Sequence, residues 1–199
     1  LPGGLRPKTW RAKVVSMAKA AEDVMIVHLA VEGDEPLLFY AGQYINIVMP
    51  DGVKRAFSFA TAPGAGPTIE LQIRRVPGGR YTTHVFEEMK VGDTVDFEGP
   101  LGSFFLREDS SKPIVFVAGA TGFAPVKSMV EHAFATGLKR RMVLYWGTRT
   151  PRDMYARELC ERWAKDHPAT FKFVPVISEA TPEDGWTGRT GLVHEAILA

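Results

Sequence analysis

The chain has almost no cysteine. Cys160 is the only one among 199 residues, which excludes an intramolecular disulfide, a four-cysteine zinc site and an iron–sulfur cluster held by this chain alone. Positive and negative charges nearly balance, because the chain has 24 Lys and Arg residues and 23 Asp and Glu residues. This balance gives no general electrostatic case for binding nucleic acid or an anionic membrane surface.

Long apolar runs are missing as well. The longest candidate is interrupted by Gly119 and Gly122, so no segment reaches the length of a membrane span, and no signal-peptide pattern opens the sequence. The five histidines are scattered and none falls at metal-ligand spacing. We therefore expect a soluble, cytoplasmic protein without a metal centre.

The first half of the chain has the periodicity of β-strands. From Trp10 to about Pro100, apolar and polar residues alternate between clusters of Gly, Pro and Asp, as in half-buried strands. The pattern predicts strands at 10–16, 25–31, 44–49, 55–60, 69–73 and 95–97, and one helix at 82–89. Six short strands with one helix are typical of a small antiparallel barrel.

The second half alternates continuous apolar strands with helices, which predicts a parallel sheet with helices on its faces. The expected strands are 114–118, 142–146 and 171–177, and the expected helices are 124–135, 151–166 and 192–198. A polar stretch at 107–112 predicts domains at 9–107 and 108–199, after a Pro- and Gly-rich linker at 1–8. Because three strands leave an open sheet edge, we expect the second domain to be incomplete at its C-terminus.

A glycine turn follows the first parallel strand. Gly119 and Gly122 lie between a β-branched run and a helical segment that opens at Pro125. Such a turn presents backbone N–H groups and the positive end of a helix dipole, which suits the pyrophosphate of a dinucleotide. An ordinary tight turn is the alternative, since G-x-x-G is only part of the G-x-G-x-x-G fingerprint.

Arg55-Ala56-Phe57-Ser58 is a second candidate site, on a predicted strand of the barrel. We expect the Arg55 guanidinium and the Ser58 hydroxyl on one face of the strand and the Phe57 ring on the other. The guanidinium could bind a phosphate through two hydrogen bonds, and the ring could stack on a flat heterocycle. The alternative is a half-exposed strand with Phe57 in the core.

Gly79-Arg80-Tyr81-Thr82 is a glycine turn that leads into the predicted helix of the barrel. Its helix N-terminus and threonine hydroxyl could hold a second phosphate. The alternative interpretation is a hairpin turn in which Thr82 or Thr83 serves as an N-cap.

A polar segment with Thr148, Arg149, Asp153 and Tyr155 follows the second parallel strand. Ligands bind at the carboxyl ends of strands in open α/β sheets, so these residues are candidates for the same nucleotide. The alternative is simple capping by Thr150 beside solvated arginines.

Taken in order, six motifs resemble the ferredoxin–NADP reductase-type flavoenzymes. They are Gly42-Gln43-Tyr44, Arg55-Ala56-Phe57-Ser58, Gly79-Arg80-Tyr81-Thr82, Gly99-Pro100-Leu101-Gly102-Ser103-Phe104, Gly119-Ala120-Thr121-Gly122 and Tyr145-Trp146-Gly147-Thr148-Arg149. Within the family, the chain is most similar to oxygenase reductases and CDP-6-deoxy-glucoseen reductase-like NADH:acceptor reductases. The resemblance implies an FAD-binding barrel followed by a nicotinamide-nucleotide-binding domain.

The resemblance also implies roles for single residues in the barrel. Arg55 would hold the pyrophosphate of FAD, Phe57 would lie against the isoalloxazine ring, and Ser58 would lie near flavin N5. The donors at Gly79–Thr83 favour FAD over FMN, because they can bind a second phosphate. The full implied FAD-binding set is Arg55, Ala56, Phe57, Ser58, Gln72, Ile73, Arg74, Gly79, Arg80, Tyr81 and Thr82.

In the second domain the resemblance implies a site for NADH, with Thr121 beside the nicotinamide and, together with Ser58, in a catalytic position. The implied set is Gly119, Thr121, Gly122, Thr148, Arg149, Asp153, Tyr155 and Glu179. Glu179 takes the place where NADPH-selective relatives tend to carry an arginine. Its carboxylate can accept a bond from a ribose hydroxyl but repels a 2′-phosphate, so NADH is expected over NADPH.

The implied function is hydride transfer from NADH to bound FAD, with electrons passed to an iron–sulfur or other redox partner, such as a ferredoxin domain. Two alternatives remain open from the sequence. One is a free-flavin reductase, which releases its flavin as a product. The other is a non-catalytic module that docks a partner. The family's Cys-Gly-Pro strand has no counterpart in the sequence.

Overall fold

The structure, a computed structural model, describes residues 5–198 and divides the chain into two compact units. The barrel unit comprises the residues up to Lys19, Asp23–Leu106 and Ala124–Thr136. The sheet unit comprises Ala20–Glu22, Arg107–Phe123 and the residues from Gly137 onward. Residues 1–4 of the predicted linker lie outside the described part of the chain.

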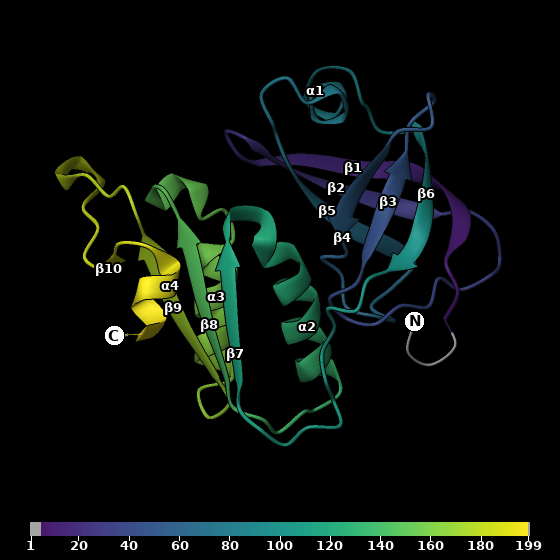
Figure 1. The fold of residues 1–199 in the computed structure, drawn as a ribbon. Helices are drawn as coiled ribbons and strands as arrows, with labels where there is room; N and C mark the ends of the chain where they lie inside the picture. The colour runs from purple at the N-terminus through teal and green to yellow at the C-terminus, as the bar shows by residue number, and fades with distance from the viewer. Residues whose placement is uncertain (1–4, 199) are drawn as a thin grey trace. The chain divides into compact units, whose positions relative to one another are not determined.

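Six antiparallel strands form the sheet of the barrel unit, as predicted (Figure 1). They are β1 (Lys8–Ala21), β2 (Val24–Val31), β3 (Tyr44–Val48), β4 (Lys54–Ser58), β5 (Thr68–Arg74) and β6 (Thr94–Leu101), in the spatial order β4-β3-β6-β1-β2-β5. The outer strands approach each other just beyond β4, where Ala60 N donates to Glu70 O over 2.9 Å. This bond curls the sheet toward a closed barrel and protects the edges that β4 and β5 would otherwise expose.

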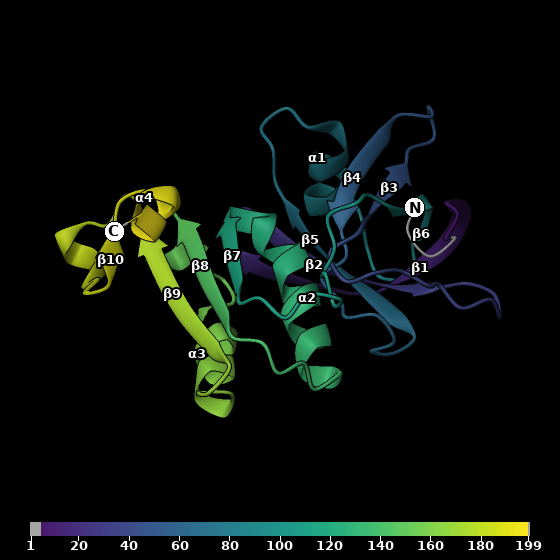
Figure 2. The ribbon, with the colours of Figure 1, turned by 60° about the horizontal axis from the view of Figure 1, so that its bottom comes forward.

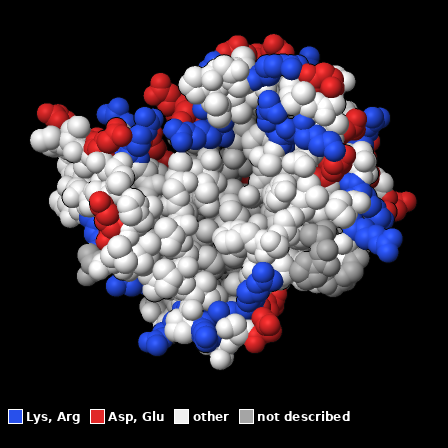
Figure 3. All heavy atoms as spheres, in the orientation of Figure 1, with Lys and Arg blue, Asp and Glu red and all other residues white. Residues whose placement is uncertain are grey.

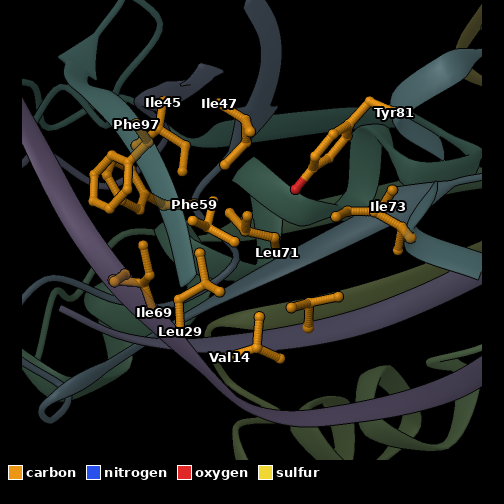
Figure 4. Close-up of a cluster of buried hydrophobic side chains, with 14 of the residues drawn as sticks. Val14, Leu29, Ile45, Ile47, Phe59, Ile69, Leu71, Ile73, Tyr81 and Phe97 are labelled. Atoms are coloured by element: carbon orange, nitrogen blue, oxygen red, sulfur yellow. The ribbon is translucent and has the colours of Figure 1, made fainter. Parts of the chain in front are cut away.

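Alternate side chains of these strands fill the barrel core (Figure 4). On β5, Ile69, Leu71 and Ile73 are at most 5% exposed, and burial of each such side chain stabilises the fold by about 1.5–3 kcal/mol. Helix α1 (Arg80–Glu87) adds Tyr81, which points toward this cluster. Burial raises the pKa of the Tyr81 phenol. The helix begins two residues before the predicted start.

The sheet unit is built on a parallel sheet, which is also as predicted (Figure 2). Its strands are β7 (Ile114–Gly119), β8 (Met142–Thr148), β9 (Phe171–Ile177) and β10 (Arg189–Thr190), in the order β10-β9-β8-β7. The helices of the second half are α2 (Phe123–Ala135), α3 (Arg157–Asp166) and α4 (Val193–Leu198). Strand β10 was not predicted, because two residues carry no periodicity. Over residues 5–198, every helix is too short or too polar to span a bilayer.

The predicted helix at 151–166 is wrong in its first part. Pro151–Asp153 forms only a single 3₁₀ turn, and α3 begins at Arg157. Asp153 closes a capping box onto Thr150, and the next residue, Met154, leaves helical geometry with φ −85° and ψ 64°. The Met154 side chain is buried, so core packing interrupts a segment whose composition favours a continuous helix.

We predict that Gly42→Ala destabilises the barrel unit more than Gly64→Ala does. Both glycines have positive φ, 106° and 74°, which costs a residue with a Cβ about 1–2 kcal/mol. A Cβ at Gly42 would also lie 2.7 Å from Phe104 O and would overlap Met129 Cε, whereas a Cβ at Gly64 would meet no atom within 4 Å. Overpacking adds about 1–3 kcal/mol at Gly42. Urea unfolding followed by circular dichroism measures both variants, and equal losses of stability would contradict the packing argument.

Candidate functional site

Strand β4 presents Arg55 and Phe57 on one face. Phe57 pairs with the core residue Ile45 across the antiparallel ladder, so both side chains lie on the same side of the sheet. Arg55, two residues away, shares this side, whereas Ala56 and Ser58 lie on the other. The prediction that Arg55 and Ser58 share a face is therefore wrong, because side chains three residues apart on a strand point in opposite directions.

The Phe57 ring lies at the border of the core. It is half-buried and packs against the core cluster, and its centroid is 5.5 Å from the Tyr81 ring. Arg55 is exposed, and its Nη1 donates to the backbone oxygen of Lys54 over 2.9 Å. An accessible aromatic edge and a solvated guanidinium are thus available on the same side of β4.

The N-terminus of α1 lacks a side-chain cap. Gly79 is the N-cap residue, and no side chain bonds to the first N–H groups of the helix. Thr82 Oγ1 instead accepts from Val76 N over 3.1 Å and lies 3.1 Å from Gly79 O, to which it can donate. The interpretation of Thr82 or Thr83 as the N-cap is therefore wrong. The uncapped donors of α1 remain available to an anion.

A cavity of about 880 Å³ opens beside this turn. Its lining residues are Ile47, Val48, Met49, Pro50, Gly78, Arg80, Tyr81, Thr83, His84, Glu88, Met89, Thr94, Val95 and Asp96. At its border, Arg80 Nη1 bonds to Asp51 Oδ2 over 2.7 Å, and both side chains are well exposed. The cavity has both apolar and charged residues in its lining and lies next to the uncapped N–H groups and the Arg80 guanidinium. This combination fits a ligand that carries both a phosphate and a ring.

The three predicted residues of β5 are less accessible. Ile73 is fully buried in the core, so only its backbone is available to a ligand. Gln72 is 5% exposed, and its Nε2 donates to Glu70 Oε1 over 2.9 Å. Arg74 is exposed, but its Nε bonds to Asp23 Oδ2 over 2.7 Å. An anion would have to compete with Asp23 for Arg74.

The glycine turn after β7 has open space around its backbone. Gly119 and Gly122 have no positive φ, and a Cβ built on either would meet no atom within 4 Å. Nothing in the described chain therefore requires glycine at these two positions, and a ligand could approach the backbone closely there. Ala120, between them, has φ 45°, and its carbonyl accepts a 2.9 Å bond from Trp146 Nε1.

The Trp146 side chain bonds to this turn and packs against two other aromatic rings. Trp146 is fully buried, and its ring stacks on Phe123 with centroids 4.2 Å apart. Tyr155 meets the Trp146 ring edge-on at 5.2 Å. Such pairs add about 0.5–1.5 kcal/mol each beyond their burial. Sequence reasoning gave Trp146 no role of its own, although its place on a continuously apolar strand indicated burial.

Two matching capping boxes shape the loops after β8 and β9. Asp153 Oδ2 accepts from both Thr150 N and Thr150 Oγ1 at 3.0 Å, and Asp184 accepts from Thr181 in the same way. These bonds hold the pKa of Asp184 below its ordinary value, and the charge of Arg152 adds to the shift. The carboxylate of Asp153 is therefore committed to its own turn, as the capping alternative proposed.

The structure brings other predicted residues together at these loops. Glu179 N donates to Arg149 O over 2.8 Å, so the two exposed residues lie on paired backbone segments. Thr148 is 7% exposed, and its hydroxyl donates to Thr150 O over 2.9 Å. The predicted residues of the sheet unit thus all lie at or after the carboxyl ends of β7, β8 and β9, the edge at which open α/β sheets bind ligands.

The remaining titratable groups do not suggest other chemistry. Among residues 5–198, no cluster of His, Cys, Asp and Glu is arranged to hold a metal ion. Cys160 is fully buried, and burial raises the pKa of its thiol. On the face drawn in Figure 3, basic and acidic atoms are interspersed without a large field of one sign.

Comparison with known proteins defines the class. The "Oxidoreductase FAD-binding domain" family matches residues 11–106, and the "Oxidoreductase NAD-binding domain" family matches residues 116–199. The chain is 40% identical over 194 residues to CDP-6-deoxy-L-threo-D-glycero-4-hexulose-3-dehydrase reductase of Yersinia pseudotuberculosis serotype I (strain IP32953), which covers 98% of the chain and 57% of that protein. It is 36% identical to NAD(P)H-flavin reductase of Aliivibrio fischeri, over 83% of the chain and 71% of the relative.

A solved structure shows the same arrangement of elements. The Amycolatopsis cytochrome P450 reductase GcoB superimposes with a TM-score of 0.86 at 35% identity, over 96% of this chain and 57% of that one. The chain thus spans little more than half the length of several relatives. It belongs to the ferredoxin–NADP reductase-type flavoenzyme family, with an FAD-binding barrel followed by an NAD-binding parallel sheet, as the six motifs predicted.

We predict that Arg80→Gln raises the pKa of Asp51 in the flavin-free protein. The Arg80 hydrogen bond is the main cause of the lowered pKa of Asp51, and the backbone N–H of Val53 contributes less. A lowered folded-state pKa means that this stabilisation is present above the unfolded value of about 3.9 and is lost as the pH falls through the folded value. Carboxyl NMR titration measures the change. Arg75→Gln, which removes a similar exposed ion pair to Glu87, should leave Asp51 unchanged, and an unchanged pKa in Arg80→Gln would contradict the assignment.

Proposed function

We propose that this chain is the FAD- and nicotinamide-binding part of an NADH-dependent oxidoreductase that passes electrons to a redox protein or a ferredoxin domain. The observation that carries the proposal is the glycine turn after β7, where Gly119 and Gly122 leave open space at the carboxyl edge of a parallel sheet. The proposed domains are residues 9–107 for FAD and 108–199 for the nucleotide. When bound, the flavin accepts a hydride from a nicotinamide and releases electrons to an acceptor.

In this proposal the barrel unit holds the phosphates of FAD with cations and backbone donors. The Arg55 guanidinium is exposed and lacks a carboxylate neighbour on its own strand, so it can give a phosphate two charge-assisted bonds. The uncapped N-terminus of α1 at Gly79 supplies further donors and a favourable dipole. Arg80 can join them only by leaving Asp51. Phe57 supplies the apolar edge against which a flat ring packs, whereas the next residue, Ser58, directs its side chain to the opposite face of β4.

The sheet unit holds the nicotinamide nucleotide in this proposal. The open backbone of Gly119–Gly122 admits the pyrophosphate, and Thr121 lies in the same turn. The stacked pair Trp146 and Phe123 keeps that turn rigid, which matters because hydride transfer depends on close alignment of two rings. Glu179 supplies a carboxylate at the adenosine side. We therefore propose NADH, with NADPH disfavoured by charge repulsion.

A free-flavin reductase is the second candidate. The similarity to NAD(P)H-flavin reductase of Aliivibrio fischeri, of which the chain covers 71%, supports it. The two candidates differ in how tightly the flavin is held. Flavin that stays with the protein through gel filtration supports the electron-transfer reductase, whereas flavin that elutes separately supports the alternative.

We predict that Arg55→Ala weakens FAD binding by about 10- to 100-fold. A hydrogen bond to a charged group contributes about 1.5–3 kcal/mol, and Arg55 would donate two. Lys54→Ala is the matched control, because it removes the same charge one residue away, where the ammonium pairs with Glu98 over 2.8 Å. Fluorescence titration of the apoprotein gives both affinities, and heat release of the native cofactor identifies it. Recovery of FMN alone, or equal losses in both variants, would contradict the site.

We predict that Glu179→Arg changes the NADH to NADPH ratio of the flavin-reduction rate constants by at least tenfold in favour of NADPH. Two like charges about 4 Å apart cost roughly 4 kcal/mol at an effective dielectric of 20 before screening, and a third of that value is already tenfold. Stopped-flow absorbance under anaerobic conditions follows the reduction. Glu158→Arg on α3 makes the same charge change elsewhere and should leave the ratio unaltered. A ratio that Glu179→Arg does not move would remove Glu179 from the site.

A further inference from the structure

Trp186 lies in the long loop that follows β9, and its indole contacts three other residues of the sheet unit. The ring is half-buried, and the guanidinium carbon of Arg157 lies 5.0 Å from its centroid, within the range of a cation–π contact. A Cβ built on Gly188 would lie 2.5 Å from Trp186 Cζ2, so the backbone of Gly188 packs closely against the ring. The indole N–H donates to Arg189 O over 2.9 Å.

These contacts join two loops at their far ends. The β8 loop (149–156) ends at Arg157, the first residue of α3, and the β9 loop (178–188) ends at Arg189, the first residue of β10. The Arg157 guanidinium is held in place by Glu161 on the same helix, which accepts from Nε over 2.6 Å. Trp186 therefore connects the end of one loop, through its ring, with the end of the other, through its N–H group.

Backbone bonds join the same two loops at their near ends. Ser178 N donates to Thr148 O over 3.0 Å, and Glu179 N donates to Arg149 O over 2.8 Å. All of these residues belong to the sheet unit. The β8 and β9 loops thus form a frame at the carboxyl edge of the parallel sheet, closed by backbone bonds at one end and by a single side chain, Trp186, at the other.

The frame carries opposite charges on its two sides. The β9 loop contributes the carboxylates of Glu179, Glu183 and Asp184, and the β8 loop contributes Arg152. Hydrogen bonds from Thr181 lower the pKa of Asp184, and the charge of Arg152 lowers it further, so Arg152 acts on a carboxylate of the opposite loop. If the loops separated, this arginine would be released and could bind an added phosphate.

We propose that Trp186 is a positioning residue that holds the β9 loop against the β8 loop and thereby sets the discrimination between NADH and NADPH. This inference rests on the proposed function, in which both loops serve the adenosine side of the nucleotide. While the loops stay joined, a 2′-phosphate would face the Glu179 carboxylate, and the charge of Arg152 is balanced by Asp184. A tryptophan suits this position because one large ring contacts an arginine and a backbone segment together.

The test measures the binding of NADH and NADPH to the flavin-free chain through nucleotide fluorescence, because no hydride is transferred without the flavin. Trp186→Ala should lower the ratio of the NADPH to the NADH dissociation constant at least threefold. Trp186→Phe keeps a ring over Arg157 but loses the bond to Arg189 O, so its decrease should be smaller.

Phe171→Leu is the control for general destabilisation. Phe171 is 4% exposed and begins β9, at the opposite end of that strand from the loop. Its truncation should leave the ratio within 1.5-fold of the parent value, because a smaller folded fraction weakens the apparent binding of both nucleotides equally.

Gly188→Ala perturbs the same contact while Trp186 stays in place. Gly188 is not among the glycines with positive φ, so alanine adds no backbone strain there, and its Cβ only displaces the indole. The variant should lower the selectivity ratio at least twofold. It decides the proposal if Trp186→Ala does not fold.

A second readout needs no ligand. Hydrogen exchange followed by NMR reports how often the amides of Glu179 and Asp184 open, which bond to Arg149 O and Thr181 O. Both should exchange at least fivefold faster in Trp186→Ala than in the parent. Phe171→Leu should leave them unchanged, since exposed loops open locally without unfolding of the sheet.

The outcomes separate this inference from the proposed function. Unchanged exchange in Trp186→Ala overturns the positioning role. A ratio that neither Trp186→Ala nor Gly188→Ala moves, or that Phe171→Leu moves equally, overturns the link to selectivity. If the parent binds neither nucleotide, or binds both equally, the proposed nucleotide site or its preference for NADH fails, and the exchange rates alone decide whether Trp186 orders the loops.

Discussion

The hydrogen bonds around Ala60 and Thr61 are the constraint on which much of the structure depends. Ala60 N bonds to Glu70 O, which brings the two outer strands of the barrel together. The carbonyls of the same two residues accept from Lys127 and Ser128 of α2. One short segment therefore both curls the sheet and anchors the helix that emerges from the glycine turn. Both roles require this backbone to be buried and fully bonded, because unpaired groups there would be costly.

The sheet unit follows a different constraint, which is that parallel strands end at a common edge. The turns after β7, β8 and β9 come from distant parts of the sequence, yet they lie together because the strands run in one direction. Each turn is stiffened by its own means. The Trp146 indole holds Ala120, and the carboxylates of Asp153 and Asp184 close capping boxes. Rigid turns at one edge suit a ligand whose position must be held closely.

Periodicity in the sequence predicted the strands well. It predicted less well which way individual side chains point, where a helix breaks and which charged residues are buried. The alternation at Ile69, Leu71 and Ile73 indicated an inward face, and burial confirmed it. The same alternation places Arg55 and Ser58, three residues apart, on opposite faces of the strand. The register of β4 against β3 shows that they do lie on opposite faces, so the prediction of a shared face misapplied the rule. Continuous helical composition after Pro151 hid the break at Met154, because burial of that side chain depends on distant core residues. Lys127 and Glu131 have ordinary i, i+4 spacing, which gave no sign of burial.

The sequence by itself determined the two kinds of domain, their order and the six motifs that resemble a flavoenzyme family. These depend on local patterns, because strand and helix periods and glycine turns are properties of neighbouring residues. Only the tertiary structure decided which side chains are accessible to a ligand and which are buried or bonded to other residues. It buried Ile73, committed Asp153 to a capping box, paired Arg80 with Asp51 and enclosed Lys127 between two carboxylates. Each of these depends on a partner brought close by packing, which no local pattern of residues contains.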